Sequence, residues 1–259
     1  MRRRVGRTIR QGYPDPDQLA ARLLEAAGNS GPPTDLDAVI DLWKGLKKRE
    51  LELDKAGYLI PLPAVGAELV VRRSDPSTRK SFTVAHELGH WTLSLFTAGA
   101  LQFEPPYKVS SRGRECAYTP DEQWCNGFAG ALLIPRDHLV AYLRLQEGLT
   151  ADLPKRVLEG PRIFNVSEDA FFQRVVRATP ISILEFVPMP GRVVPRRRYV
   201  SPSLTREAEA LERICERLAG KLTGEESDSL LFPDVAYQPY HSGWIVCVAP
   251  TTSADRLCS

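Results

Sequence analysis

Two histidines four residues apart, with a glutamate directly after the first, leave this chain few folds to choose from. They are His86, Glu87 and His90, in the segment SFTVAHELGHWTL (81–93). The residues from about 76 to 96 predict one long helix. Because an α-helix advances about 100° per residue, both imidazoles project from the same side, one turn apart. They can then reach one tetrahedral zinc at about 2.0–2.1 Å, with Glu87 placed to take a proton from water.

The neighbours of the pair are apolar, among them Val84, Ala85, Leu88 and Trp91. A histidine pair on an exposed helix would have charged neighbours, so this helix is expected to be buried. The alternative is that the two histidines are ordinary polar groups on a helix face. With four histidines in 259 residues, such a spacing rarely arises by chance. Gly89 costs a helix about 1 kcal/mol relative to alanine, so we expect it to admit another element closely.

A catalytic zinc needs a third protein ligand and an open position. Further along the same helix Leu93 and Phe96 stand where some metallopeptidases place a glycine and a third histidine, so the ligand must come from elsewhere. The segment Thr119-Pro120-Asp121-Glu122 also fits a capping box, in which the Glu122 carboxylate bonds back to the helix start. From the residues alone both roles of Glu122 stay open. The candidate third ligands are Glu115, Glu122, His138 and His241.

The N-terminal 150 residues predict an α+β domain. Asp15 and Pro16 carry the signature of a helix start, as N-cap and first helical residue. Short strands punctuated by proline and glycine follow the second helix. The expected elements are helices over 13–28 and 36–43, strands in 46–54, 57–63 and 67–73, and helices over 76–96, 119–133 and 136–145.

The remainder predicts a second, smaller α+β unit. Residues 151–180 indicate short helices, with Ser167 as an N-cap, and form a helix-turn-helix-like segment. Residues 181–259 form a small C-terminal domain. Its expected elements are a hairpin over 181–200, an amphipathic helix over 203–222 and a final strand over 243–250.

Composition narrows the class of protein. The net charge of +2 is too small to indicate nucleic-acid binding, and the arginines concentrated in 1–10 and 191–199 are interpreted as a solvated tail and hairpin. Five widely spaced cysteines contain no CxxC pair. Neither a secretory signal nor an apolar run of about 20 residues is present, so we expect a cytoplasmic protein with no membrane segment.

Two motifs resemble the ImmA/IrrE-type metallopeptidases. RKSFTVAHELGHWTL is followed, 32 residues after His90, by ExxCNxFAxxLLIP (122–135). The family usually shows ANxFAxxLLMP at the second motif, so Cys125 and Ile134 are mild departures. The resemblance covers about residues 55 to 145.

The resemblance implies a zincin-like domain in which His86, His90 and Glu122 hold the metal and Glu87 is the general base. It favours Glu122 as a ligand over Glu122 as a cap. The metal is expected to be Zn²⁺, although two imidazoles and a carboxylate also suit Mn²⁺. The substrates of such enzymes are helix-turn-helix repressors, cut at one site to release stress-response or mobile-element genes. IrrE-like members add a helix-turn-helix-like segment and a GAF-like sensor domain.

The chain departs from that plan in its second half. Gly160-Pro161 is expected to interrupt the first helix of the segment at 153–177, which argues against direct DNA binding. Residues 181–259 are short for a GAF domain, so they are either a reduced sensor or a structural cap. Tyr118, just before Glu122, is a candidate oxyanion donor or an ordinary loop residue. The alternative to a peptidase is a metal-containing regulator that binds a partner or DNA without cutting it.

Overall fold

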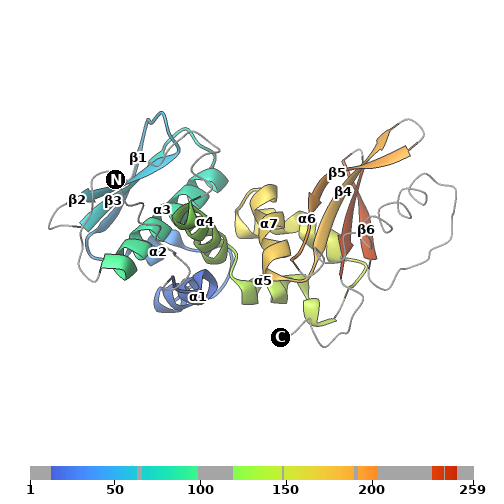
Figure 1. Cartoon of the computed structure of the whole chain (residues 1–259), viewed down its shortest axis with the longest axis horizontal. Coiled ribbons are helices and arrows are strands. Elements are labelled where there is room, and N and C mark those ends of the chain that lie inside the picture. Colours follow the sequence, from blue (N-terminus) through green and yellow to red (C-terminus); the bar gives the residue numbers. More distant parts are fainter. Residues whose placement is uncertain are drawn as a thin grey trace, which may run out of the picture. The chain divides into compact units, whose positions relative to one another are not determined.

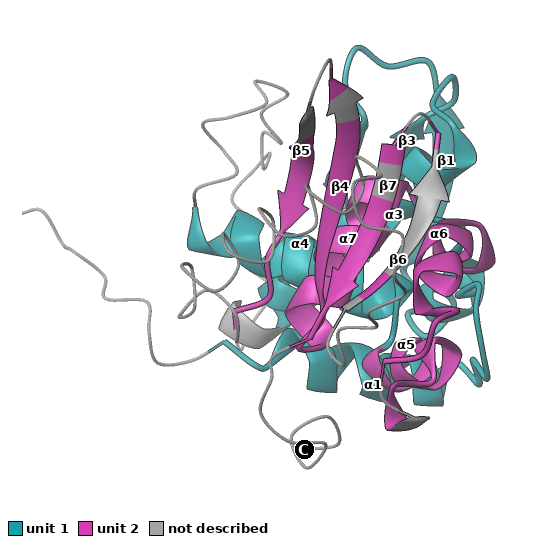
Figure 2. Cartoon of the chain, turned by 90° about the vertical axis from the view of Figure 1, so that its right-hand side faces the viewer, with its two compact units in different colours: residues 1–135, 164–166 teal, residues 136–163, 167–259 magenta. Residues whose placement is uncertain are grey.

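The computed structural model describes residues 13–62, 66–98, 119–147, 149–189, 192–202, 235–241 and 243–249. The chain divides into two compact units, residues 1–135 with 164–166 and residues 136–163 with 167–259 (Figures 1 and 2). Helices and small sheets occur in both units, which confirms the predicted α+β class. The predicted domain boundaries near 150 and 180 stay predictions.

The first unit contains a three-stranded sheet of β1 (Leu46–Leu51), β2 (Gly57–Leu62) and β3 (Gly66–Arg72). The order is β1-β3-β2, with β1 parallel and β2 antiparallel to the central β3. All three strands were predicted as short runs separated by glycine and proline, although only β2 and β3 are largely apolar and β1 is mostly charged and exposed. Both β1 and β2 are edge strands, a point that matters for the site.

Among its described residues the first unit also has four helices: α1 (Pro16–Ala26), α2 (Leu36–Ile40), α3 (Ser77–Ala98) and α4 (Pro120–Leu133). Helix α3 packs on β2 and β3, and α4 packs along α3 (Figure 1). The predicted caps are confirmed, because the Asp15 and Thr119 side chains each accept a hydrogen bond from the first turn of the following helix. Helix α2 is shorter than predicted and ends at Ile40, and the chain turns before Trp43.

The second unit begins with α5 (Arg136–Leu143) and the short 3₁₀ helix η2 (Leu145–Glu147). Helices α6 (Leu153–Phe164) and α7 (Glu168–Ala178) follow, α7 starting at the predicted N-cap Ser167. The antiparallel sheet has the order β5-β4-β7-β6. Its strands are β4 (Ser182–Met189), β5 (Arg192–Tyr199), β6 (Val235–Tyr240) and β7 (Gly243–Val248).

The sequence-based prediction was wrong at Pro161, because α6 continues through Gly160-Pro161 to Phe164. A proline lacks the amide that would bond to the carbonyl of Val157, yet only three helical residues follow it. Packing compensates for the loss: a Cβ at Gly160 would lie 2.1 Å from the Phe171 ring, so the glycine lets α7 pack directly on α6. The helix is therefore maintained by tertiary contacts that local propensity does not register.

The prediction also missed β6, which pairs with β7 as a hairpin. The predicted helix over 203–222 lies outside the described residues. Within the described part of the chain, no helix has the length and apolar character needed to cross a membrane.

Candidate metal centre

The His-Glu-Leu-Gly-His segment lies in the middle of α3, on the face that packs against the rest of the first unit. His86 is 9% exposed, Glu87 1% and His90 7%. Val84, Ala85 and Leu88 are buried around them, as the apolar pattern predicted. Burying three ionisable side chains on one helical turn costs free energy unless they are paired or bind an ion. The segment therefore indicates a site rather than a packing surface.

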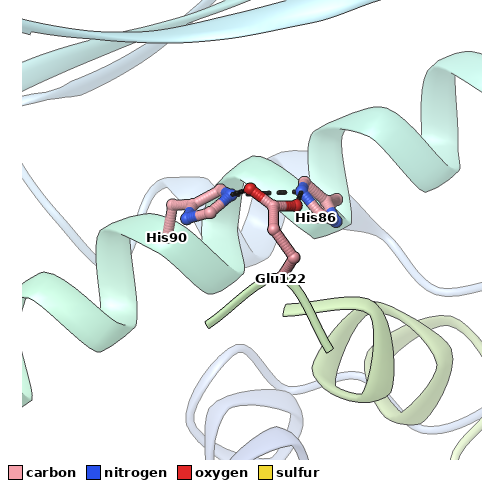
Figure 3. A group of neighbouring side chains, drawn as sticks. All are labelled: His86, His90 and Glu122. Atoms are coloured by element: carbon pink, nitrogen blue, oxygen red, sulfur yellow. Dashed lines mark hydrogen bonds and ion pairs between the residues drawn. The ribbon is translucent and has the colours of Figure 1, made fainter. Parts of the chain in front are cut away.

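Three side chains from two helices converge on one point (Figure 3). The Nε2 atoms of His86 and His90 lie 3.1 Å apart. Glu122, from α4, places one carboxylate oxygen 3.2 Å from His86 Nε2 and the other 3.4 Å from His90 Nε2. Ligands about 2.0–2.1 Å from a tetrahedral zinc are separated from one another by about 3.3–3.4 Å. The group fits that spacing, and among the described residues it is the cluster of metal-binding type.

The sequence left open whether Glu122 caps helix α4 or binds a metal, and the structure divides these roles between its backbone and its side chain. Its backbone N–H donates to Thr119 Oγ1 at 3.3 Å, so the amide belongs to the helix cap. Its carboxylate is directed to the two imidazoles instead. Hydrogen bonds from His86 and His90 lower the pKa of this carboxyl to about 2, more than its partial burial raises it. The side chain is therefore an anion at neutral pH and is available as a metal ligand.

Burial and the neighbouring carboxylates shift the pKa of His86 in opposite directions. Burial alone would lower the pKa of His86, but the hydrogen bond with Glu122 and the charges of Glu87 and Glu122 together raise it. A metal cation would occupy the place of that proton, because it is attracted by the same negative charges.

Glu87 is the most buried of the three ionisable side chains in the segment and is not part of the converging group. Burial raises the pKa of its carboxyl, partly offset by the nearby histidines and by a hydrogen bond from the Leu59 backbone. Its Oε2 atom has no hydrogen-bond partner among the described residues. A buried carboxylate oxygen left without a partner is rare, and it makes Glu87 a candidate to bind a ligand or exchange a proton.

Gly89 has the role that the sequence predicted for it. A Cβ at this position would lie 3.1 Å from Cys125 Cα and 3.3 Å from Cys125 Sγ. Its absence lets α4 approach α3 closely, and this approach brings Glu122 to the histidines. Cys125 is a buried free thiol whose pKa is raised mainly by burial.

Sequence reasoning gave no role to two groups that the structure places at the site. The Nδ1 atom of His86 lies 3.1 Å from Asn126 Oδ1, and the Leu59 backbone meets Glu87. The signal for Asn126 was its spacing, one helical turn after Glu122 on α4. No sequence signal identifies a backbone amide such as that of Leu59.

The other candidates have different outcomes. His138 and His241 belong to the second unit and are not members of the cluster. Tyr118 and Glu115 lie outside the described residues. The oxyanion role of Tyr118 stays a prediction.

Comparison with known proteins agrees with this geometry. Residues 52–175 match the family model described as Peptidase_M78, IrrE N-terminal-like domain. All of the residues discussed above in α3 and α4 lie inside that range. The match confirms the resemblance found in the sequence, and with it the zincin-like fold. No curated protein matches the chain.

Solved structures that match include a Mycobacterium tuberculosis transcriptional regulator, with 20% sequence identity and a TM-score of 0.43. The match covers 75% of this chain and 59% of that one. The chain therefore spans about three fifths of the length of that regulator.

Proposed function

We propose, on the premise that residues 52–175 form an IrrE N-terminal-like domain of the M78 peptidases, that the chain is a zinc-dependent endopeptidase. Its substrate would be a helix-turn-helix repressor, cut at one site to derepress stress-response or mobile-element genes. The observation that carries the proposal is the buried Glu87 oxygen, which has no hydrogen-bond partner in the described part of the chain, beside the His86–His90–Glu122 group.

The three converging side chains suit the metal, and their chemistry defines its role. His86, His90 and Glu122 would hold Zn²⁺, with Mn²⁺ as the other ion that this ligand set accepts. When bound, the ion would polarise the scissile carbonyl and acidify the attacking water.

Glu87 supplies the proton transfers. Its Oε2 atom would accept a proton from the attacking water and later deliver it to the leaving amine. A general base works best when its pKa lies near the working pH, and burial shifts the pKa of Glu87 upward in that direction.

The geometry favours β2 as the strand that receives the substrate. Both β1 and β2 are edges of the sheet, but it is Leu59 of β2 whose backbone meets Glu87. An extended peptide added to this edge would be held by main-chain hydrogen bonds, which carry little sequence selectivity. Selection of one repressor would then come from contacts with its folded part, for which the second unit is available as a reduced sensor or docking domain.

Direct DNA binding is not part of the proposal. In a DNA-binding helix-turn-helix, the first residues of the second helix contact the bases. Here α7 begins with the exposed acidic residues Glu168 and Asp169. Those charges would repel phosphate. We expect the protein to act in the cytoplasm, where repressors are found.

The test is a cleavage experiment with the zinc-loaded full chain and the helix-turn-helix repressor encoded nearest to it. The intact mass of the repressor is followed over time, beside a Glu87→Gln control. One new cut seen only with the unmodified chain supports the proposal. A stable complex with no cut under any zinc or manganese loading would instead support the alternative, a metal-containing regulator that binds its partner without proteolysis.

A further inference from the structure

Helix α4 contacts both ring nitrogens of His86. The Nε2 atom faces Glu122 at 3.2 Å, and the Nδ1 atom faces Asn126 Oδ1 at 3.1 Å. Glu122 and Asn126 are four residues apart and therefore share one face of α4. The imidazole belongs to α3, so its orientation is set by a pair of side chains on the neighbouring helix.

We propose that Asn126 is a positioning residue that holds the proton of His86 on Nδ1 and so reserves Nε2 for the metal. A neutral imidazole has one N–H donor and one acceptor, and the bond made by one nitrogen decides the state of the other. An amide oxygen can only accept, so Nδ1 must carry the hydrogen that joins it to Asn126. The inference rests on the metal site of the proposed function.

The surroundings of Asn126 support a directed role. Asparagine is a poor helix former, and α4 is otherwise rich in alanine, leucine and other apolar residues. The residue is half-buried rather than solvent-facing. Its carboxamide reaches across the narrow gap that Gly89 maintains between α3 and α4. Partners of this kind, which hold a metal-binding histidine by its second nitrogen, typically change metal affinity by about 10–100-fold when removed.

The first measurement is zinc affinity of the full chain by competition with a chelator. Asn126→Leu has a similar size but no acceptor, and it should weaken zinc binding by about 10–100-fold. Asn126→Asp keeps an oxygen in place and should stay within a few-fold of the unmodified chain. Gln123→Leu makes the matching amide-to-leucine change at an exposed position of the same helix and should leave affinity unchanged.

The second measurement reads the proton directly. The zinc-loaded chain is labelled with ¹⁵N-histidine and its ring signals are recorded, because in the metal-free chain the Glu122 carboxylate faces Nε2 and would itself hold a proton there. With four histidines in the sequence, His86 is assigned by comparison with His86→Gln. The proton should be on Nδ1 in the unmodified chain and in Asn126→Asp. This experiment stands even if Asn126→Leu fails to fold.

Two results would overturn the inference: a proton on Nε2 of His86 in the unmodified chain, or zinc affinity in folded Asn126→Leu equal to that of the parent. Failure of the proposed function has a separate signature. A chain that binds zinc with the expected dependence on Asn126 but cuts no repressor keeps this inference and loses the peptidase proposal.

Discussion

Two buried glutamates, one in each compact unit, show how differently this chain treats a carboxylate removed from water. Glu87 in α3 is 1% exposed and has an oxygen without a hydrogen-bond partner among the described residues. Glu185 in β4 is 6% exposed and has two arginine partners. Arg196 Nη1 lies 3.1 Å from one of its oxygens and Arg197 Nε 3.6 Å from the other.

Local geometry explains the pairing of Glu185. The register between β4 and β5 shifts at Glu185/Phe186, so that Arg197 lies opposite Glu185 and Pro195 opposite Phe186. Arg196 is therefore an extra residue in the strand, and such a bulge lets neighbouring side chains point the same way. The comparison teaches that burial alone does not mark a functional acid. Glu185 has partners supplied by the fold, whereas Glu87 lies beside a group of metal-binding type and has an oxygen with no partner among the described residues, which makes Glu87 the candidate for chemistry.

The largest expected effect is on catalysis. Glu87→Gln keeps the size of the side chain but removes the proton acceptor, so repressor cleavage should fall by at least about 100-fold. Zinc content should not change, because Glu87 is not in the converging group. The measurement is the cleavage rate and bound zinc of the same preparation. Glu185→Gln is the matched control and should alter neither quantity; cleavage retained in Glu87→Gln would remove the distinction between the two acids.

The next effect is on metal affinity. Glu122→Ala removes one of three ligands and should weaken zinc binding by more than about 100-fold, since loss of even an indirect partner costs about 10–100-fold. Thr119→Ala, which removes the cap of the same helix, should cost about 1 kcal/mol of stability and leave zinc bound. Chelator competition and denaturant unfolding separate the two. If Glu122→Ala binds zinc normally and is merely destabilised, Glu122 is a capping residue.

A smaller effect, on the free energy of unfolding, is expected from changes in the second unit. Replacing Arg196 and Arg197 together by alanine leaves the buried Glu185 without its two charged partners. The free energy of unfolding should fall by about 1–2 kcal/mol, a modest value because both arginines are partly exposed. Adding Glu185→Gln should recover part of this loss. Urea unfolding measures it, and an unchanged midpoint in the double variant would show that Glu185 is not stabilised by these arginines.

The smallest effect is a pH dependence of stability in the metal-free protein. Burial raises the pKa of Glu87 above 4.5, so its folded form resists ionisation and stability falls as pH rises from about 4.5. The pKa of Glu122 is lowered to about 2, so its contribution is complete above pH 4.5 and is lost as pH falls towards 2.

Thermal unfolding in the presence of a chelator checks both signs. Glu87→Gln should gain stability relative to the unmodified chain only above about pH 4.5, and Glu122→Gln should lose it over the same range. A stability difference for Glu87→Gln that is constant from acidic to neutral pH would mean that Glu87 ionises in the folded protein as it does in water.

Much of the first unit could be predicted because its signals are local. The helix starts at Asp15 and Thr119, the strands around Leu59 and Leu69, and the metal-binding spacing of α3 all depend on a few neighbouring residues. The resemblance to a known family then selected Glu122 among several candidate ligands. For the packing of α4 on α3, the sequence indicated only that Gly89 would let some other element approach closely, without identifying α4.

What the sequence could not provide depends on tertiary contacts. The partner of His86 Nδ1, Asn126, becomes meaningful only when α3 and α4 lie side by side. Helix α6 continues through Pro161 because Phe171 packs on Gly160. Strand β6 was missed because Gln238 and Pro239 weaken its strand pattern, and its hairpin pairing with β7 compensates.

The most direct test of the central claim is the anomalous diffraction of zinc in crystals of the loaded full chain. The account predicts one peak per chain, about 2.0–2.1 Å from Nε2 of His86 and of His90 and at a similar distance from a Glu122 oxygen, with Glu87 beside it but not coordinated. A peak away from these three side chains, or one ligated by Glu87, would contradict the assignment of Glu87 as the free base.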